Sequence, residues 1–259
     1  MLGLIRYSVE KPFKSLLNLP DDIFQPDYFN YRFNIFKEIT LKSLYWQIYK
    51  DFKVLIYHSD KMPQELRKLF VDIEQQHPFI RNIFQPGARI EVPKEFMDDA
   101  LLTFRLDNDD GLPRDITQKL SAYENKAYAG VNIVFPETIA VQKANDDEFF
   151  IEDLYYVKSP MAMAYVAKAS DENICLLGDH TKIYKNFPTL MLPGAGGLMT
   201  INGENCANHL KKHYIINRCD LQSKLKELNY PEFDFDCLRS IIKPVDYHRG
   251  KTIMPKVNK

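Results

Sequence analysis

The strongest constraint on the fold is that short apolar runs alternate with amphipathic segments in the N-terminal part of the chain. The apolar runs are residues 2–9, 52–57, 80–84 and 101–106. Runs of this kind are typical of strands in a parallel sheet, which are buried on both faces. Residues 32–49 and 63–76 carry apolar side chains at helical spacing, and residues 94–100 predict a shorter helix. Alternating strands and helices predict an α/β fold.

The second half of the chain departs from this alternation. After a helix from Arg114 to about Lys126, we expect strands at residues 129–135, 138–142 and 149–157, joined by connections too short for crossover helices. Such strands pair antiparallel. Further expectations are a strand at 174–177, a glycine-rich loop at 193–197 and short helices at 208–214, 221–228 and 235–242. The predicted fold class is therefore α/β, with a mixed, mostly parallel sheet flanked by helices and a C-terminal helical segment.

The composition excludes several classes of protein. With 45% hydrophobic and 13% aromatic residues, the chain is expected to fold around a core. A formal net charge of -1 provides no overall field to attract nucleic acid. The cysteines form no CxxC pair, which argues against a zinc ribbon or a disulfide scaffold and indicates reduced thiols. No apolar run reaches the roughly 18 residues of a transmembrane segment. We therefore expect a cytoplasmic protein, either free or peripheral to a membrane.

An acidic cluster, Asp107-Asn108-Asp109-Asp110, follows the apolar run 101–106 directly. Ligands of open α/β sheets bind beyond the carboxyl ends of the strands, where this cluster is predicted to lie. Asp107 and Asp109 could share a divalent cation, Mn²⁺ or Mg²⁺, completed by phosphate oxygens of a substrate. A solvated acidic turn is the alternative. Arg105 favours the ligand site, because a charged residue inside an apolar strand needs a partner.

Two further residues are predicted near strand ends. Arg6 lies near the end of the first apolar run and could contact a diphosphate through its guanidinium, or form a structural ion pair. Asp60 follows the second run and could accept hydrogen bonds from a base or ribose, or cap the following helix. Both residues are candidates for binding a nucleotide.

Two later pairs of residues are weaker candidates. Asp179 and His180 follow the run 174–177, where a histidine beside a carboxylate could complete a metal site or remove the proton of an acceptor hydroxyl. A structural histidine is the alternative. Glu204 and Asn205 follow the glycine-rich loop and could contact a sugar or the metal, or simply form a turn.

Other motifs point away from common chemistries. His209 and His213 stand four residues apart but lack the glutamate of HExxH, which favours surface histidines. The glycine-rich loop at 193–197 matches neither a P-loop nor a dinucleotide-binding motif. The sequence contains no GxSxG motif, so a hydrolase with that nucleophile is excluded.

Several stretches together resemble the putative rhamnosyltransferase family of GT-A glycosyltransferases. They are Leu4-Ile5-Arg6-Tyr7-Ser8, Tyr31-Arg32-Phe33-Asn34-Ile35-Phe36, Thr40-Leu41-Lys42-Ser43-Leu44 with Gln47, Phe104-Arg105-Leu106-Asp107-Asn108-Asp109-Asp110, Ser159-Pro160-Met161-Ala162-Met163, His180-Thr181-Lys182-Ile183 and Phe187-Pro188-Thr189. The resemblance covers roughly residues 1–210. It departs at Asn202-Gly203-Glu204-Asn205, where the family tends to have Arg-Gly-His-Asn. Glu204 or His180 would then replace that histidine.

The resemblance implies a GT-A-like, Rossmann-like fold and a metal-dependent glycosyltransferase. A UDP- or dTDP-sugar would be the nucleotide-diphosphate donor, L-rhamnose the sugar suggested by the family name, and a glycan or glycoconjugate hydroxyl the acceptor. By similarity, Asp107 would lie near the ribose and the metal, and Asp109 would hold the metal under the diphosphate. We expect a catalytic domain at 1–214, with a nucleotide-sugar part at about 1–115 and an acceptor part at about 116–214, and a helical appendage of the same domain at 215–259.

Three sets of site residues follow. They are Arg6, Asp60, Arg105, Asp107, Glu204 and Asn205 for the nucleotide sugar, Asp107, Asp109 and His180 for the metal, and Asp179 and His180 for catalysis. Two other functions fit the same residues. One is a catalytically silent module that binds nucleotide sugars or carbohydrate, and the other is a metal-dependent nucleotidyltransferase or phosphohydrolase.

Overall fold

The computed structural model describes residues 1–9, 23–97, 102–145, 147–155, 161–169, 171–201 and 214–234, and the fold below concerns these residues alone. Its strands are β1 (Leu2–Ser8), β2 (Lys53–Ser59), β3 (Ile80–Gln85), β4 (Leu102–Asp107), β5 (Asp110–Gly111), β6 (Asn132–Val134), β7 (Glu137–Lys143), β8 (Glu148–Tyr155), β9 (Ala164–Val166), β10 (Thr189–Met191), β11 (Ala195–Ile201) and β12 (Tyr214–Asn217). Its helices are α1 (Pro26–Ile35), the π-helical η2 (Phe36–Leu41), α2 (Lys42–Tyr45), α3 (Gln64–Gln76), α4 (Lys94–Met97), α5 (Ile116–Ser121), α6 (His180–Asn186) and α7 (Arg218–Glu227), with 3₁₀ turns η3 (Lys126–Tyr128) and η4 (Ile174–Leu176).

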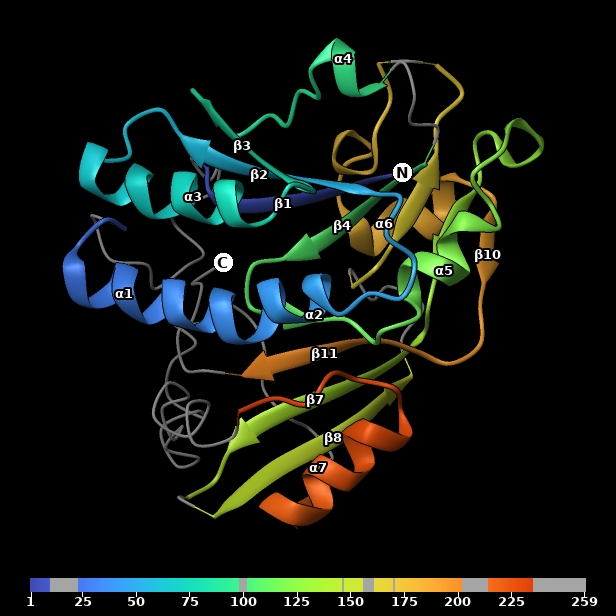
Figure 1. Cartoon of the computed structure of the whole chain (residues 1–259). Helices are drawn as coiled ribbons and strands as arrows, with labels where there is room; N and C mark the ends of the chain where they lie inside the picture. Colours follow the sequence, from blue (N-terminus) through green and yellow to red (C-terminus); the bar gives the residue numbers. More distant parts are fainter. Residues whose placement is uncertain are drawn as a thin grey trace, which may run out of the picture.

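The larger of two sheets in the described residues has the strand order β10-β6-β9-β4-β1-β2-β3 (Figure 1). Strands β4, β1, β2 and β3 are parallel neighbours, whereas β9 runs antiparallel to both β4 and β6. Both faces of β1 are covered: Ile5 belongs to one hydrophobic core and Leu4 to another. The predicted mixed, mostly parallel sheet flanked by helices is therefore confirmed.

One continuous helical segment, α1–η2–α2, lies between the two sheets (Figure 1). Phe36 packs into the core of the larger sheet, and Ile39 packs against the smaller sheet. The long helix predicted at 32–49 exists, but its bounds are different. It begins at Pro26, because proline has no backbone N–H and the N–H of a first helical residue would have no partner within the helix. It ends at Tyr45, after which the Ile48 amide donates to the Arg114 carbonyl at 2.7 Å instead of continuing the helix.

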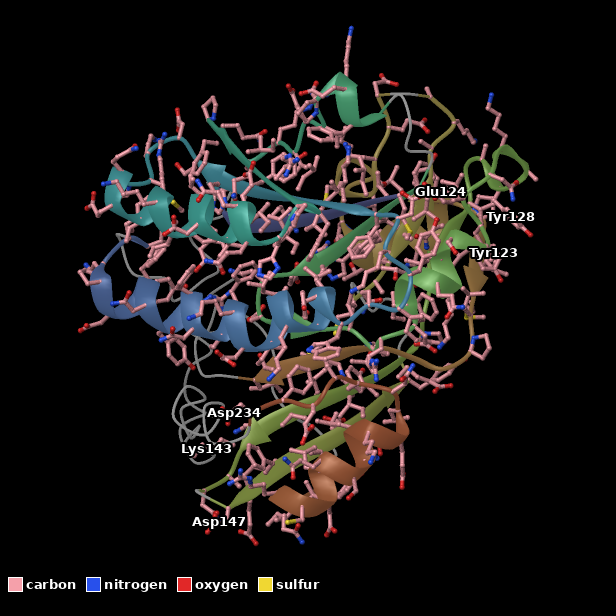
Figure 2. All side chains as sticks on the ribbon, in the orientation of Figure 1. Tyr123, Glu124, Tyr128, Lys143, Asp147 and Asp234 are labelled. Atoms are coloured by element: carbon pink, nitrogen blue, oxygen red, sulfur yellow. The ribbon has the colours of Figure 1, made fainter. Side chains whose placement is uncertain are left out.

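The smaller sheet has the order β12-β8-β7-β11-β5 within the described part of the chain. Strands β7 and β8 pair antiparallel, as their short connection predicts, and Leu221 and Leu225 of α7 pack on the sheet. In Figure 2, Lys143 and Asp147 mark one end of this sheet, and Asp234 is labelled on the same side of the view. Tyr123, Glu124 and Tyr128 lie on the opposite side, near α5. Glu124 there forms an ion pair of 2.5 Å with the amino group of Met1.

Several local predictions need correction. The apolar run 174–177 is not a strand: it forms the turn η4, because the Asn173 side chain accepts a hydrogen bond from the Cys175 amide and starts a 3₁₀ turn. The glycine-rich stretch 193–197 is not simply a loop, since strand β11 begins at Ala195. The helix predicted from Arg114 to Lys126 is limited to α5, followed by η3.

The C-terminal predictions have mixed outcomes. The helix expected at 221–228 is confirmed as α7. Tyr214 begins strand β12 rather than ending a helix, and residues 208–213 and 235–242 lie outside the described residues. None of the described helices combines the length and the apolar character that crossing a bilayer requires.

Candidate functional site at the ends of β1 and β4

Side-chain alternation along β4 places Arg105 and Asp107 on one face of the larger sheet. Successive residues of a strand point to opposite faces, so Thr103, Arg105 and Asp107 share a face, and Phe104 takes the other. Thr103 accepts a hydrogen bond from the amide of Ile174, at the start of η4. This face of β4 is therefore the one covered by the η4–α6 region.

Arg105 connects β4 to the start of α6. Its Nη2 donates to Oδ1 of Asp107 at 2.8 Å, and its Nη1 lies 3.4 Å from Nδ1 of His180. The Arg105 side chain is 8% exposed and that of Asp107 is 39% exposed, so the guanidinium of the pair is buried and the carboxylate is open to solvent. The expectation that Arg105 needs a partner is met within its own strand.

Arg6 faces the same carboxylate from the neighbouring strand. Arg6 on β1 stands opposite Asp107 on β4 in the parallel register, and its side chain is exposed. Burial by itself would raise the pKa of Asp107, but the positive charges of Arg105 and Arg6 outweigh it and hold that pKa at about 2. Asp107 is thus an anion between two guanidinium groups, which can also bind phosphate oxygens.

His180 is the first residue of α6 and is neutral at pH 7. Burial, followed by the charge of Arg105, lowers its pKa below 6.5, although Asp107 acts in the opposite direction. An arginine can only donate, so when Nδ1 accepts from Arg105 the hydrogen of the imidazole lies on Nε2. In this arrangement His180 offers a donor to a ligand at the strand ends.

The other half of the acidic cluster is turned towards α1. Arg32 Nη1 donates to Oδ2 of Asp109 at 3.0 Å, and Arg32 Nη2 donates to the side-chain oxygen of Asn108. The side chains of Arg32 and Asp109 are 15% and 10% exposed. The carbonyl of Asp109 also accepts from Thr200 Oγ1 in β11 at 2.6 Å. Asp107 and Asp109 therefore have separate arginine partners.

Asp110 ends the cluster as a buried carboxyl group. Burial, and then the negative charges of Asp109 and Asp107, raise its pKa well above the usual value. Its carbonyl accepts a hydrogen bond of 2.9 Å from Thr40 in the π-helical segment η2. π-Helical turns often mark functional sites, and here the turn fixes the chain that leaves the acidic cluster.

The remaining predicted residues lie at the edge of the site or outside the described chain. Asp179 does not follow a strand: it is the N-cap of α6, and its Oδ1 accepts from the Thr181 amide and hydroxyl at 2.9 and 2.8 Å. Asp60 follows β2 as predicted and is exposed, and its carbonyl accepts from Arg67. Glu204 and Asn205, like His209 and His213, lie outside the described residues.

The donor set for a divalent cation is only partly suited to one. In the described part of the chain, no group of three or more His, Cys, Asp or Glu side chains could hold a metal ion. Asp107 fits, because Mg²⁺ and similar ions are commonly held by one or two carboxylates together with substrate phosphates. Asp109 fits less well, because Arg32 already neutralises its carboxylate.

Sequence reasoning assigned no role to Arg32 or Cys175. Arg32 was visible only as part of a family-like stretch, and its contact with Asp109 joins residues 77 positions apart. Cys175 is partly buried beside Arg105, Arg6 and Asp107, and burial raises the pKa of its thiol. A lone cysteine in an apolar run gives no sequence signal for this position.

Comparison with known proteins gives a family and several distant structural likenesses. A family model described as "Putative rhamnosyl transferase" matches residues 1–214. No curated protein matches the sequence. S. aureus TarS 1-349 in complex with UDP-GlcNAc is similar with a TM-score of 0.44 and 10% identity, over 81% of this chain and 61% of that one. The same TarS fragment in complex with UDP has a TM-score of 0.43 and 10% identity, over 78% and 60%.

A further likeness is to a Putative Glucose-1-Phosphate Thymidylyltransferase from Bacillus anthracis in complex with a sucrose. Its TM-score is 0.34 and its identity 9%, over 91% of this chain and 99% of that one. The chain covers less than two thirds of the TarS structures, at 60% and 61% of their length.

Proposed function

Because the chain belongs to the putative rhamnosyl transferase family, and is by that description a glycosyltransferase, we propose that it moves a sugar from a nucleotide-diphosphate sugar to a hydroxyl of a glycan acceptor. The family's name suggests L-rhamnose as the sugar, with UDP or dTDP as the nucleotide. The observation that carries the proposal is the Asp107 carboxylate held between Arg6 and Arg105 at the ends of β1 and β4.

The two arginines suit a diphosphate leaving group. Each guanidinium can donate two parallel hydrogen bonds to phosphate oxygens, and Arg6 is exposed at the strand end. His180 adds a third donor through Nε2. These groups would bind the donor and stabilise negative charge that develops on the diphosphate as the glycosidic bond breaks. Asp60, one strand further along the sheet edge, would contact the base or ribose.

A divalent cation would neutralise the leaving diphosphate when bound. Asp107 would hold it, with His180 beside the same carboxylate. Asp109 would join this set only if the ion pair with Arg32 opens. Glu204 and Asn205 stay proposed contacts of the donor sugar on the ground of their place in the sequence after the glycine-rich loop.

For proton removal from the acceptor, Asp179 is the better of the two candidates. It is exposed, and hydrogen bonds from Thr181 lower its pKa, so it is ionised at neutral pH. His180 can act as the base through Nε2 only if Arg105 releases Nδ1, because the imidazole hydrogen can then move to Nδ1 and leave Nε2 with a lone pair that accepts a proton. Asp179→Asn and His180→Gln separate the two roles: loss of the base lowers kcat, and loss of a donor contact raises KM.

The test is an incubation with a panel of UDP- and dTDP-sugars and Mn²⁺, with products identified by mass spectrometry. We expect release of the nucleoside diphosphate with the sugar transferred intact, or hydrolysed in the absence of acceptor. Asp107→Asn should abolish this, and Asp153→Asn, which alters an exposed carboxylate on β8, should not. Tight donor binding without turnover would instead indicate a silent binding module, and a product carrying the nucleotide would indicate a nucleotidyltransferase.

A further inference from the structure

A second candidate site lies between α2 and α7. The chain from 228 to 234, drawn in red in Figure 1, passes between these helices. The α2–α7 groove has a volume of about 580 Å³ and is lined by Lys42, Trp46, Arg114, Arg218, Gln222 and the segment Pro231–Asp234. Ligand sites commonly measure about 300–1,000 Å³, so this groove has room for a ligand of several rings.

The groove lining combines an open aromatic ring with an arginine. Trp46 is 45% exposed, and the guanidinium of Arg114 lies 5.6 Å from the centre of its ring. The neighbouring Tyr45 is 51% exposed and meets Trp46 edge to face at 5.7 Å. Exposed aromatic rings of this size, gathered with charged groups, mark binding surfaces more often than ordinary solvent-facing residues do.

Positive charge gathers beside these two rings. Arg114 Nε is buried and has no hydrogen-bond partner among the described residues. Lys50 stands 5.4 Å above the ring of Tyr45. Burial, and then the charge of Arg114, lower the pKa of Lys50, which agrees with an excess of positive charge here. The nearby Asp115 is paired with Lys119 at 3.1 Å, so its charge is already matched.

The groove lining also contains two carboxylates. Glu232 is exposed in the lining segment, and Asp234 follows it; Figure 2 places Asp234 on the side of the view to which β2 and β4 point in Figure 1. Carboxylates accept hydrogen bonds from sugar hydroxyls and repel a continuous polyanion. The ligand should therefore carry an anionic group, an apolar ring face and hydroxyl groups.

We propose that the α2–α7 groove binds an acidic oligosaccharide, with its anionic group at Arg114, a sugar ring against Trp46 and hydroxyl groups at Glu232. Nucleic acid fits less well, because its phosphates would continue past the two carboxylates and the chain has a formal net charge of -1. None of its lining residues is among those proposed for the donor site, and its test does not depend on transferase activity.

Trp46 reports directly on the groove, because it is the only tryptophan of the chain. The full chain is titrated with a galacturonic acid hexasaccharide, a neutral maltohexaose and a single-stranded hexadeoxythymidylate, and the tryptophan fluorescence is followed. The acidic oligosaccharide should change the emission saturably. Saturable binding of the neutral sugar with equal affinity, tighter binding of the nucleotide, or no change with any probe would each overturn the proposal.

Variants test which residues hold the anion. Arg114→Gln and Lys42→Gln should each weaken binding of the acidic oligosaccharide by about tenfold, the value of one charge-assisted contact. Arg89→Gln removes the same charge from an exposed position outside the groove and should leave binding unchanged. Thermal unfolding of each variant shows whether it is folded. If Arg114→Gln does not fold, the affinity of Lys42→Gln still tests the assignment. Unchanged affinity in the folded groove variants contradicts the assignment.

Discussion

Arg32 in α1 donates a hydrogen bond of 3.0 Å to Asp109, 77 residues further along the chain, and this contact ties the helix between the two sheets to the acidic cluster. Both side chains are mostly buried. The same guanidinium also donates to Asn108. Arg32 thereby occupies the carboxylate of Asp109 and leaves Asp107 as the carboxylate that is open to a ligand.

Removing Arg32 should destabilise the fold strongly. Arg32→Gln leaves Asp109 as a mostly buried carboxylate without its cation, which typically costs about 3 kcal/mol of unfolding free energy. The double variant Arg32→Gln/Asp109→Asn should lose less than the sum of the single variants, because both changes remove one shared interaction. Urea denaturation measures all three. Strict additivity would show that the ion pair contributes nothing.

Removal of divalent metal should abolish transfer, and Asp107 should matter more than Asp109. After EDTA treatment we expect Mn²⁺ to restore turnover in the wild type. Asp107→Asn should lower kcat/KM by about 100-fold or more, since the cation stabilises the leaving group by several kcal/mol. Metal-independent turnover would refute the proposed cofactor. If Asp109→Asn lost turnover as completely while keeping wild-type stability, Asp109 would be the metal ligand instead.

Acid should destabilise the protein through His58. This imidazole is buried against Phe70 and Phe84, with ring-centre distances of 4.2 and 4.9 Å, and its Nδ1 has no partner among the described residues. Burial lowers its pKa to about 3, so it stays neutral when folded and takes up a proton when unfolded below pH 6.5. The contribution of neutral His58 to the unfolding free energy is therefore fully present above pH 6.5, and it is lost as the pH falls from there towards 3.

The loss attributable to His58 between pH 7 and pH 5 should be about 2 kcal/mol. His58→Gln cannot titrate, so its unfolding free energy should fall by that much less over the same interval in urea denaturation. Asp107 acts in a different window, because its lowered pKa contributes stability that is lost only as the pH falls from about 4 towards 2. Parallel curves for the wild type and His58→Gln would refute the assignment to His58.

Gly196 in β11 should tolerate no side chain. A Cβ at this position would lie 2.3 Å from Cβ of Phe135 and 2.8 Å from the Phe135 carbonyl oxygen. Since the nearest atoms include backbone, relief requires the strand to move, and Gly196→Ala should cost about 3 kcal/mol, the upper part of the overpacking range. An unfolding midpoint equal to that of the wild type would show that β11 and the Phe135 region do not pack this closely.

Local patterns were enough to predict much of the larger sheet. Strands β2, β3 and β4 form where the runs 52–57, 80–84 and 101–106 predict strands, and α3 forms where 63–76 predicts a helix. Burial on both faces and helical spacing are properties of contiguous residues. Alternation along β4 likewise predicts that Arg105 and Asp107 share a face. The position of the acidic cluster after a strand follows from the same local reasoning.

The predictions from local sequence were wrong where a distant contact decides the local structure. Residues 174–177 are as apolar as a strand, but Asn173 starts a turn whose first amide, at Ile174, donates to Thr103 in β4. The glycines after Gly194 predicted a loop. In the structure Gly196 and Gly197 belong to β11, where the absence of a side chain lets the strand approach Phe135 and Met161. Neither partner can be deduced from the neighbouring sequence.

The sequence by itself therefore determined the α/β class, the parallel strands and the placement of Arg6, Asp60 and Asp107 at strand ends. Tertiary structure alone decided that Arg32 neutralises Asp109 and that Arg105 and His180 meet. The physical reason is range: hydrophobic periodicity acts within one element, but the partner of a charge depends on which elements the fold brings together.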